Sequence, residues 1–254
     1  MKITLIQPET VWNNQEANIS KAEAMILKAD GTDLILLPET FNSGFLPAET
    51  VQCTGSARQT VDWLKGIARR NDAAVCTSIF ERVNGSLYNR LFFVTPGGDT
   101  HVYDKRHLFI GDEKKRVTPG KKRVVVTFRG WRILLQICYD LRFPVWSRNR
   151  DDYDLAVYVA NWPEPRADVW KTLLKARAME NQCYVAGVNR VGKDPNGIAF
   201  AGESKVLDPY GRDIISLKAF AETQGTADLS LEQLIRFRND FPVLPDRDEF
   251  TLII

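Results

Sequence analysis

The chain has 254 residues, of which 44% are apolar and 26% charged, as in ordinary globular proteins. Its formal net charge of +2 gives no long-range field for nucleic acid or an anionic membrane. No apolar run approaches the roughly 18 residues of a transmembrane helix, and residues 1–7 have the pattern of a strand rather than a signal peptide. Four irregularly spaced cysteines favour reduced thiols in the cytoplasm over a disulfide framework.

Apolar runs alternate with amphipathic segments along the chain. Helical spacing of apolar residues predicts helices over 17–29, 58–70, 168–181 and 230–240. Asp168 is expected to cap the third helix and Ser230 the fourth. Short apolar runs predict strands at 3–7, 33–38, 73–80, 90–95, 124–128, 131–138, 154–160, 183–189, 204–208, 212–217 and 225–229.

The number of predicted strands exceeds what one doubly wound sheet of this length needs. Residues 33–37 are apolar after Asp33, and residues 155–159 are apolar throughout, which is typical of strands buried on both faces. Two packed sheets covered outside by helices would satisfy this pattern. No linker composition divides the chain, so a single domain over 1–254 is expected. Residues from about 241 to 254 are expected to form an extended tail, which lies over its own domain or crosses to a partner.

Three of the buried-looking strands end in chemically capable residues. Glu39 follows the strand at 33–37, Cys138 ends the strand at 131–138, and Asn161 and Trp162 follow the strand at 154–160. Sites in α/β sheets form beyond the carboxyl ends of strands. If these strands are parallel neighbours, the side chains converge on one crevice.

Cys138 is the candidate nucleophile, because a helix start after the strand would favour the thiolate. Most free cysteines are inert core, and that interpretation is retained for Cys53, Cys76 and Cys183.

A thiol that attacks an amide needs a partner that accepts and returns a proton. His107 is the candidate for a Cys–His pair, whereas His101 is expected to be solvated. The alternative is a carboxylate whose pKa is raised by burial, and Glu39 has that context. Lys105 could favour the thiolate and hold an oxyanion. Taken singly, Glu39 and Lys105 are more readily interpreted as surface charges.

The segments 36–41 (LLPETF), 103–109 (YDKRHLF) and 137–144 (ICYDLRFP) resemble, in this order, the three signature segments of the nitrilase superfamily. The similarity runs over nearly the whole chain and includes Glu113 with the following TPG at 118–120, the segment RAMENQ at 177–182 and DPYG at 208–211. Within the superfamily the chain is most similar to the ω-amidase branch, on VANWP at 159–163 and FPVW at 143–146.

This resemblance implies a four-layer αββα sandwich, commonly assembled as a homodimer. It implies a catalytic triad of Glu39, Lys105 and Cys138, with Glu113 as a second carboxylate. Glu39 would move the proton, while Lys105 and the backbone N–H of Tyr139 would hold the oxyanion. No metal or organic cofactor is implied, since a thiol, a carboxylate and an ammonium supply the required chemistry.

For an ω-amidase the resemblance implies 2-oxo dicarboxylate monoamides as substrates, such as 2-oxoglutaramate and 2-oxosuccinamate. Arg142 is the candidate for binding the substrate carboxylate, although a salt bridge to Asp140 would explain it equally well. Trp162 and Phe41 would wall a narrow pocket or belong to the core. Asn161 could donate a hydrogen bond from the rim.

Three alternatives stay open from the sequence. The chain could be another amidase, a carbamoylase or a nitrilase of the same superfamily. It could be a Cys–His hydrolase that uses His107. It could also be a non-enzymatic assembly protein, although a binding module has no need of the four matched residues.

Overall fold

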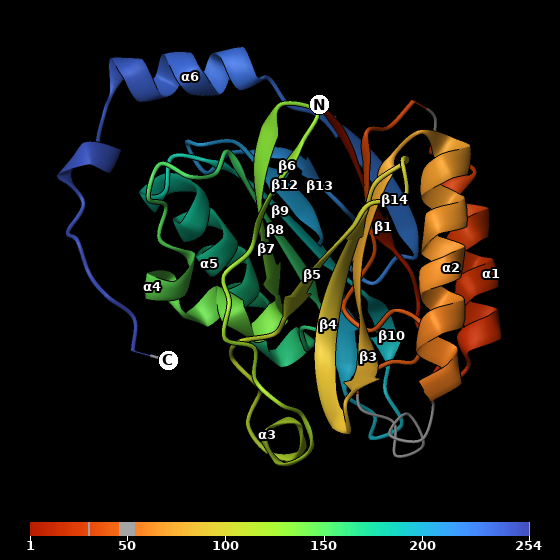
Figure 1. Cartoon of the computed structure of the whole chain (residues 1–254). Coiled ribbons are helices and arrows are strands. Elements are labelled where there is room, and N and C mark those ends of the chain that lie inside the picture. Colours follow the sequence, from red (N-terminus) through yellow and green to blue (C-terminus); the bar gives the residue numbers. More distant parts are fainter. Residues whose placement is uncertain (30, 46–53, 254) are drawn as a thin grey trace.

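A computed structural model describes residues 1–29, 31–45 and 54–253. Two six-stranded sheets pack face to face, and helices cover their outer faces, so that four layers follow one another as α, β, β and α (Figure 1). The predicted αββα sandwich is confirmed.

The first sheet has the order β14-β1-β2-β3-β4-β5. Strands β1, β2 and β3 are parallel, and the remaining pairs are antiparallel. Helices α1 and α2 cover its outer face (Figure 1). Its elements are β1 (Lys2–Gln7), α1 (Gln15–Ile26), β2 (Leu34–Leu36), α2 (Thr54–Asn71), β3 (Ala74–Val83), β4 (Ser86–Val94), β5 (Thr100–Asp104) and β14 (Thr223–Asp228).

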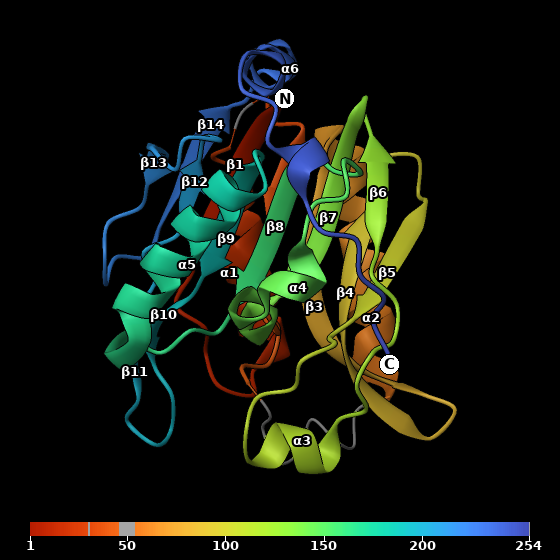
Figure 2. The same cartoon turned by 90° about the vertical axis from the view of Figure 1, so that its left-hand side faces the viewer.

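The second sheet has the order β13-β12-β9-β8-β7-β6, with β7, β8 and β9 parallel. Helix α5 packs on its outer face (Figure 2). Its elements are β6 (Val125–Phe128), β7 (Trp131–Ile137), α4 (Pro144–Ser147), β8 (Leu155–Ala160), α5 (Ala167–Glu180), β9 (Tyr184–Asn189), β12 (Lys205–Leu207) and β13 (Asp213–Ser216). Outside both sheets lie α3 (Asp112–Arg116), the hairpin of β10 (Val191–Lys193) and β11 (Ala199–Ala201), and α6 (Leu231–Asp240).

Burial on both faces explains the continuous apolar runs. Successive side chains of a strand point to opposite faces. In β2, Leu34 and Leu36 join the core between the two sheets, whereas Ile35 joins the cluster beneath α1 and α2. Both faces of this strand are therefore dry, and the sequence shows no polar alternation there.

The predicted strands and the four predicted helices all occur, with boundaries shifted by a few residues. The elements that the apolar pattern missed are β5, β10, β11, α3 and α4, which are short or polar. Ser230 caps α6 as expected, accepting from the backbone N–H of Gln233 at 3.2 Å. The predicted cap of α5 was wrong: Asp168 lies in its first turn, and Arg166 occupies the cap position without a side-chain bond.

The tail beyond α6 lies over its own chain (Figure 2). Leu244 is buried, and the Arg150 guanidinium lies over the Phe250 ring at 4.8 Å. Cys76 and Cys183 are buried free thiols, as expected, while Cys53 lies outside the described residues. Within the described part of the chain, no helix is long and apolar enough to cross a membrane.

Candidate active site

The candidate residues meet because the two sheets face each other. Strands β7 and β8 are parallel neighbours, so Cys138 and Asn161 follow adjacent strand ends. The condition that all three strands are parallel neighbours is met by β7 and β8 but not by the strand before Glu39, since β2 belongs to the opposite sheet. Glu39 reaches Asn161 across the gap between the sheets, where the backbone N–H of Asn161 donates to Glu39 Oε2 at 2.8 Å.

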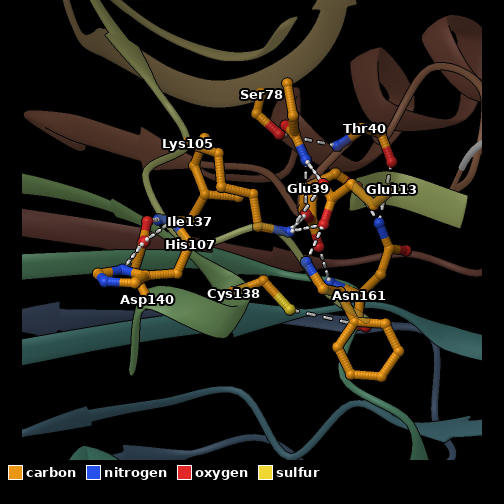
Figure 3. A network of polar contacts seen from close by, with 12 residues as sticks. Glu39, Thr40, Ser78, Lys105, His107, Glu113, Ile137, Cys138, Asp140 and Asn161 are labelled. Atoms are coloured by element: carbon orange, nitrogen blue, oxygen red, sulfur yellow. Dashed lines mark hydrogen bonds and ion pairs between the residues drawn. The ribbon is translucent and has the colours of Figure 1, made fainter. Parts of the chain in front are cut away.

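Lys105 lies between two buried carboxylates (Figure 3). Its Nζ donates to Glu39 Oε1 at 2.8 Å and to both oxygens of Glu113 at 3.0 Å. The three side chains are no more than 1% exposed. An ammonium in so dry a place requires anionic partners, and the two neighbouring carboxylates raise the pKa of Lys105 although burial alone would lower it. Lys105 therefore stays charged.

Two further donors fix the carboxylates. Asn89, which is buried in β4, donates from Nδ2 to Glu39 Oε1 at 2.8 Å and to Glu113 Oε1 at 3.1 Å. The backbone N–H of Phe109 donates to Glu113 Oε2 at 2.6 Å. Burial, and secondarily repulsion from Glu39, raises the pKa of Glu113, although Lys105 acts in the opposite direction. Each oxygen of Glu113 thus accepts from two donors, which orients the carboxylate rigidly.

The sequence offered a weak signal for Asn89, because this amide and Arg90 directly precede the apolar run at 91–94 of β4. No spacing rule connects it to Glu39, which lies 50 residues earlier in the chain.

Cys138 occupies a strained elbow. Its φ of 44° lies in the left-handed region that non-glycine residues seldom adopt. It begins a five-residue 3₁₀ helix, Cys138–Arg142, directly after β7. The Sγ atom points toward Asn161 and lies 3.8 Å from the backbone oxygen of that residue (Figure 3). The elbow turns the thiol away from the strand and toward the Glu39–Lys105–Glu113 network.

The resting thiol is protonated. Burial, and secondarily the Glu39 carboxylate, raises the pKa of Cys138 well above its usual range, although the Lys105 ammonium acts in the opposite direction. A nucleophile of this kind needs a base at the moment of attack, and Glu39 is the nearby carboxylate that could serve as one.

Asp140 fastens the elbow to the opposite sheet. Its carboxylate accepts from the backbone N–H of Ile137 at 3.0 Å and of His107 at 3.0 Å, and from the hydroxyl of Tyr103 at 2.7 Å. His107 Nδ1 lies 2.8 Å from the same carboxylate, and its ring stacks on Phe143 at 3.8 Å. The His107 ring is thereby engaged with Asp140 rather than with the Cys138 thiol (Figure 3).

A cavity of about 300 Å³ opens beside the thiol. Cys138, Lys105 and Glu113 form part of its lining, and aromatic rings form much of the rest. A small organic molecule fits a space of this size and polarity. Within the described residues, no group of three or more His, Cys, Asp or Glu side chains is arranged to hold a metal ion.

Four of the five expected substrate-binding residues line this cavity: Tyr139, Arg142, Asn161 and Trp162. The expected donation from Asn161 was wrong, because its Nδ2 already donates to the backbone oxygen of Glu39 at 2.6 Å and to Thr40 Oγ1 at 2.9 Å. Arg142 forms no salt bridge with Asp140; its guanidinium lies over the Trp162 ring at 5.3 Å. The placement of Phe41 as a pocket wall was wrong. Its ring is 1% exposed and stacks on Trp63 at 5.5 Å, in the cluster beneath α1 and α2.

Comparison with known proteins agrees with this geometry. The family model described as carbon-nitrogen hydrolase matches residues 2–239. The chain belongs to the carbon–nitrogen hydrolase family. It is 46% identical to omega-amidase YafV of Escherichia coli strain K12, over 99% of this chain and 98% of that protein. It is 33% identical to 2-oxoglutaramate amidase of Bacillus subtilis, over 96% of each chain.

Solved structures of this family superpose closely on the chain. XC1258 from Xanthomonas campestris, a CN-hydrolase superfamily protein with an arsenic adduct in its active site, gives a TM-score of 0.96 at 42% identity, covering 99% of this chain and 98% of that one. A mutant of the amidase from Nesterenkonia sp. AN1, with acrylamide added to its active-site cysteine, gives 0.84 at 25% identity, covering 94% and 97%. This carbon–nitrogen hydrolase thus shares its whole architecture with amidases.

Proposed function

We propose that this carbon–nitrogen hydrolase is an ω-amidase, which hydrolyses the terminal amide of 2-oxo dicarboxylate monoamides to the 2-oxo acid and ammonia. The observation that carries the proposal is the buried Lys105 ammonium held between Glu39 and Glu113, beside a thiol that opens into a cavity with an arginine. The names of the relatives, omega-amidase and 2-oxoglutaramate amidase, support the same substrate class.

In the first half-reaction the Cys138 thiol gives its proton to Glu39 as sulfur attacks the amide carbon. Lys105 and the backbone N–H of Tyr139 stabilise the oxyanion that forms. Each such donor lowers a barrier by roughly 3–4 kcal/mol in other enzymes. Glu39 then protonates the leaving nitrogen, ammonia departs, and a thioester on Cys138 remains.

In the second half-reaction water hydrolyses the thioester. Glu39, again a carboxylate, takes a proton from the water as its oxygen attacks the acyl carbon. The carbon–sulfur bond breaks, the thiolate takes that proton from Glu39, and the 2-oxo acid leaves. Glu113 does not exchange protons in this scheme. It orients Lys105 through its two 3.0 Å contacts.

The substrate's carboxylate binds at the other end of the cavity. Arg142 supplies the cation, and Trp162 holds that guanidinium in place by stacking. Asn161 is 7% exposed, and its Oδ1 has no hydrogen-bond partner among the described residues. We propose that this oxygen accepts a hydrogen bond from the N–H of the substrate amide.

The test is ammonia release from 2-oxoglutaramate, with Cys138→Ala and Glu39→Gln as variants and glutamine as a second substrate. Rapid release that both variants lose, with glutamine a poor substrate, is the expected result. A panel of nitriles and N-carbamoyl compounds covers the related branches of the superfamily. Faster turnover of any of these than of 2-oxoglutaramate would overturn the ω-amidase proposal.

The Cys–His alternative has its own test. Because the His107 ring is engaged with Asp140, His107→Asn is expected to keep kcat within about tenfold of wild type, the loss of one structural contact rather than of a base. A loss comparable with that of Cys138→Ala would restore the alternative.

We also propose that the whole chain acts as one domain in a cytoplasmic homodimer. Three large apolar side chains between α5 and the tail are substantially exposed: Met179 by 47%, Tyr210 by 50% and Phe241 by 61%. A second copy that covers this patch would remove it from water. Sedimentation equilibrium of wild type and Phe241→Asp tests the surface, and an unchanged dimer in the variant would refute it.

A further inference from the structure

The cavity contains positively charged side chains to which the proposed function assigns no role. Besides Lys105 and Arg142, its lining includes Arg166 and Arg190. Arg190 is 1% exposed and is committed to the backbone: Nε donates to Val191 O at 3.0 Å, and Nη2 donates to Thr10 O at 3.0 Å. It therefore holds the hairpin β10–β11 against the N-terminal segment.

The guanidinium groups of Arg142 and Arg166 are not bound to the backbone in this way. Among the described residues, neither guanidinium has an ion pair or a hydrogen bond, and each lies over an aromatic ring. The Arg142 guanidinium is 5.3 Å from the centroid of Trp162, and that of Arg166 is 5.3 Å from the centroid of Phe109. An aromatic face fixes a guanidinium while its in-plane N–H groups stay free for a carboxylate.

The position of Arg166 is anchored independently of its charge. The indole N–H of Trp162 donates to the backbone oxygen of Arg166 at 2.8 Å. The same indole carries Arg142 on its face, so one side chain positions both arginines. Arg166 extends from the edge of α5 to Phe109, which follows β5 of the opposite sheet. Arg166 therefore links the two walls of the cavity.

The acidic side chains of the lining contact partners other than Arg142 and Arg166. Glu113 holds Lys105, and Asp112 lies 3.7 Å from Lys115. Asp194 Oδ1 accepts from the backbone N–H groups of Asn196 and Ile198, each at 2.9 Å. Two guanidinium groups thus remain without a counter-anion among the described residues.

We infer that Arg166 is a second substrate-binding residue, which together with Arg142 binds the carboxylate end of the amide and excludes amides with an ammonium beside that carboxylate. This inference rests on the proposed function and specifies how the site selects its substrate. Two fixed cations attract a 2-oxo acid carboxylate at short range, whereas an α-ammonium placed there meets both of them.

The variants are Arg166→Gln, Arg166→Lys and Arg142→Gln. Arg212→Gln is the matched control, because Arg212 also lies over a ring, at 4.4 Å from the centroid of Tyr210, but is not part of the cavity lining. The substrates are 2-oxoglutaramate, glutamine and pentanamide, a neutral amide of the same chain length.

With Arg166→Gln, kcat/KM for 2-oxoglutaramate is expected to fall about tenfold to a hundredfold, the range for losing one hydrogen bond to a charged group. The value for pentanamide is expected to stay within about threefold, so that an effect on folding is separated from one on recognition. The preference for 2-oxoglutaramate over glutamine should fall as well, and Arg166→Lys should restore part of the loss. Equal losses on charged and neutral amides, or no loss at all, would overturn the inference.

Calorimetric binding of the product 2-oxoglutarate separates this inference from the proposed function. Weaker binding to Arg166→Gln, with Arg212→Gln unchanged, supports the assignment of Arg166. If wild type binds 2-oxoglutarate through Arg166 but releases no ammonia from 2-oxoglutaramate, the ω-amidase proposal fails and the carboxylate site stands. If binding does not depend on Arg166, the inference fails.

Discussion

Glu113→Gln tests whether the buried network positions the catalytic ammonium. Glu113 Oε1 accepts from Lys105 and Asn89, and Oε2 accepts from Lys105 and Phe109. Whichever oxygen becomes an amide NH₂, it faces two donors, and both hydrogen bonds are lost. Lys105 then keeps Glu39 Oε1 and the remaining amide oxygen as acceptors, but it loses one of its two anionic partners. A lost hydrogen bond to a charged group costs about 1.5–3 kcal/mol, so Lys105 is expected to shift rather than stay in place.

A displaced Lys105 no longer faces the developing oxyanion. Losing one such donor raises the barrier by about 2.7–4 kcal/mol, which is about 10²- to 10³-fold in kcat at 1.36 kcal/mol per factor of ten. KM should change much less, because Glu113 does not bind the substrate carboxylate. The assay is steady-state ammonia release, with thermal unfolding measured on the same preparations.

The matched control is Glu203→Gln. Glu203 also pairs with a lysine, Lys171, at 3.1 Å, but outside the cavity. This variant should keep the wild-type kcat. A Glu113→Gln enzyme with kcat within threefold of wild type would refute the positioning argument and leave Glu113 as a structural carboxylate.

Three further outcomes are expected. Burial raises the pKa of the three described thiols, so the folded state keeps protons that the unfolded state loses above pH about 8.5. The free energy of unfolding should therefore fall as pH rises beyond that value, by up to about 1.4 kcal/mol per thiol and pH unit. A urea midpoint that stays flat between pH 8 and 10 would contradict this. A Cβ on Gly120 would lie 2.0 Å from the Asp104 backbone oxygen, so Gly120→Ala should lose about 1–3 kcal/mol of unfolding free energy in a urea titration. Gly97→Ala is the control and should be neutral, because its Cβ would meet its nearest neighbour at an ordinary 3.8 Å. Asp140→Asn should lower kcat and the melting temperature together, because its carboxylate joins the elbow to the opposite sheet; wild-type values of both would dismiss that role.

The sequence predicts the buried strands well because burial leaves a simple signature. Residues 155–160 have no polar member apart from the phenol of Tyr158, since both faces of β8 are covered. The polar edge strand β5 has three exposed residues among its five, so no apolar pattern marks it. The short helix α3 consists entirely of charged residues and was missed for the same reason.

The site was predictable in its residue types and only partly in its geometry. The ends of strands indicated Glu39 and Cys138, Lys105 was the candidate for holding the oxyanion, and the family resemblance supplied Glu113. Neither indicated that Glu39 arrives from the opposite sheet, because strand pairing depends on contacts between distant segments. For Phe41 the sequence left a pocket wall and a core aromatic open, and its ring packs on Trp63 of α2 in the core.

Because the catalytic network is divided between two sheets, catalysis depends on how closely the two sheets pack against each other. Glu39 and Lys105 follow strands of one sheet, while Cys138 and Asn161 follow strands of the other. A partly loosened state that keeps both sheets but loses side-chain packing between them would retain its far-UV circular dichroism. It would have no intact proton path, however. Inactivation on heating should therefore precede the loss of secondary structure. Conservative substitutions in the layer between the sheets should lower kcat even where the substituted residue lies far from Cys138.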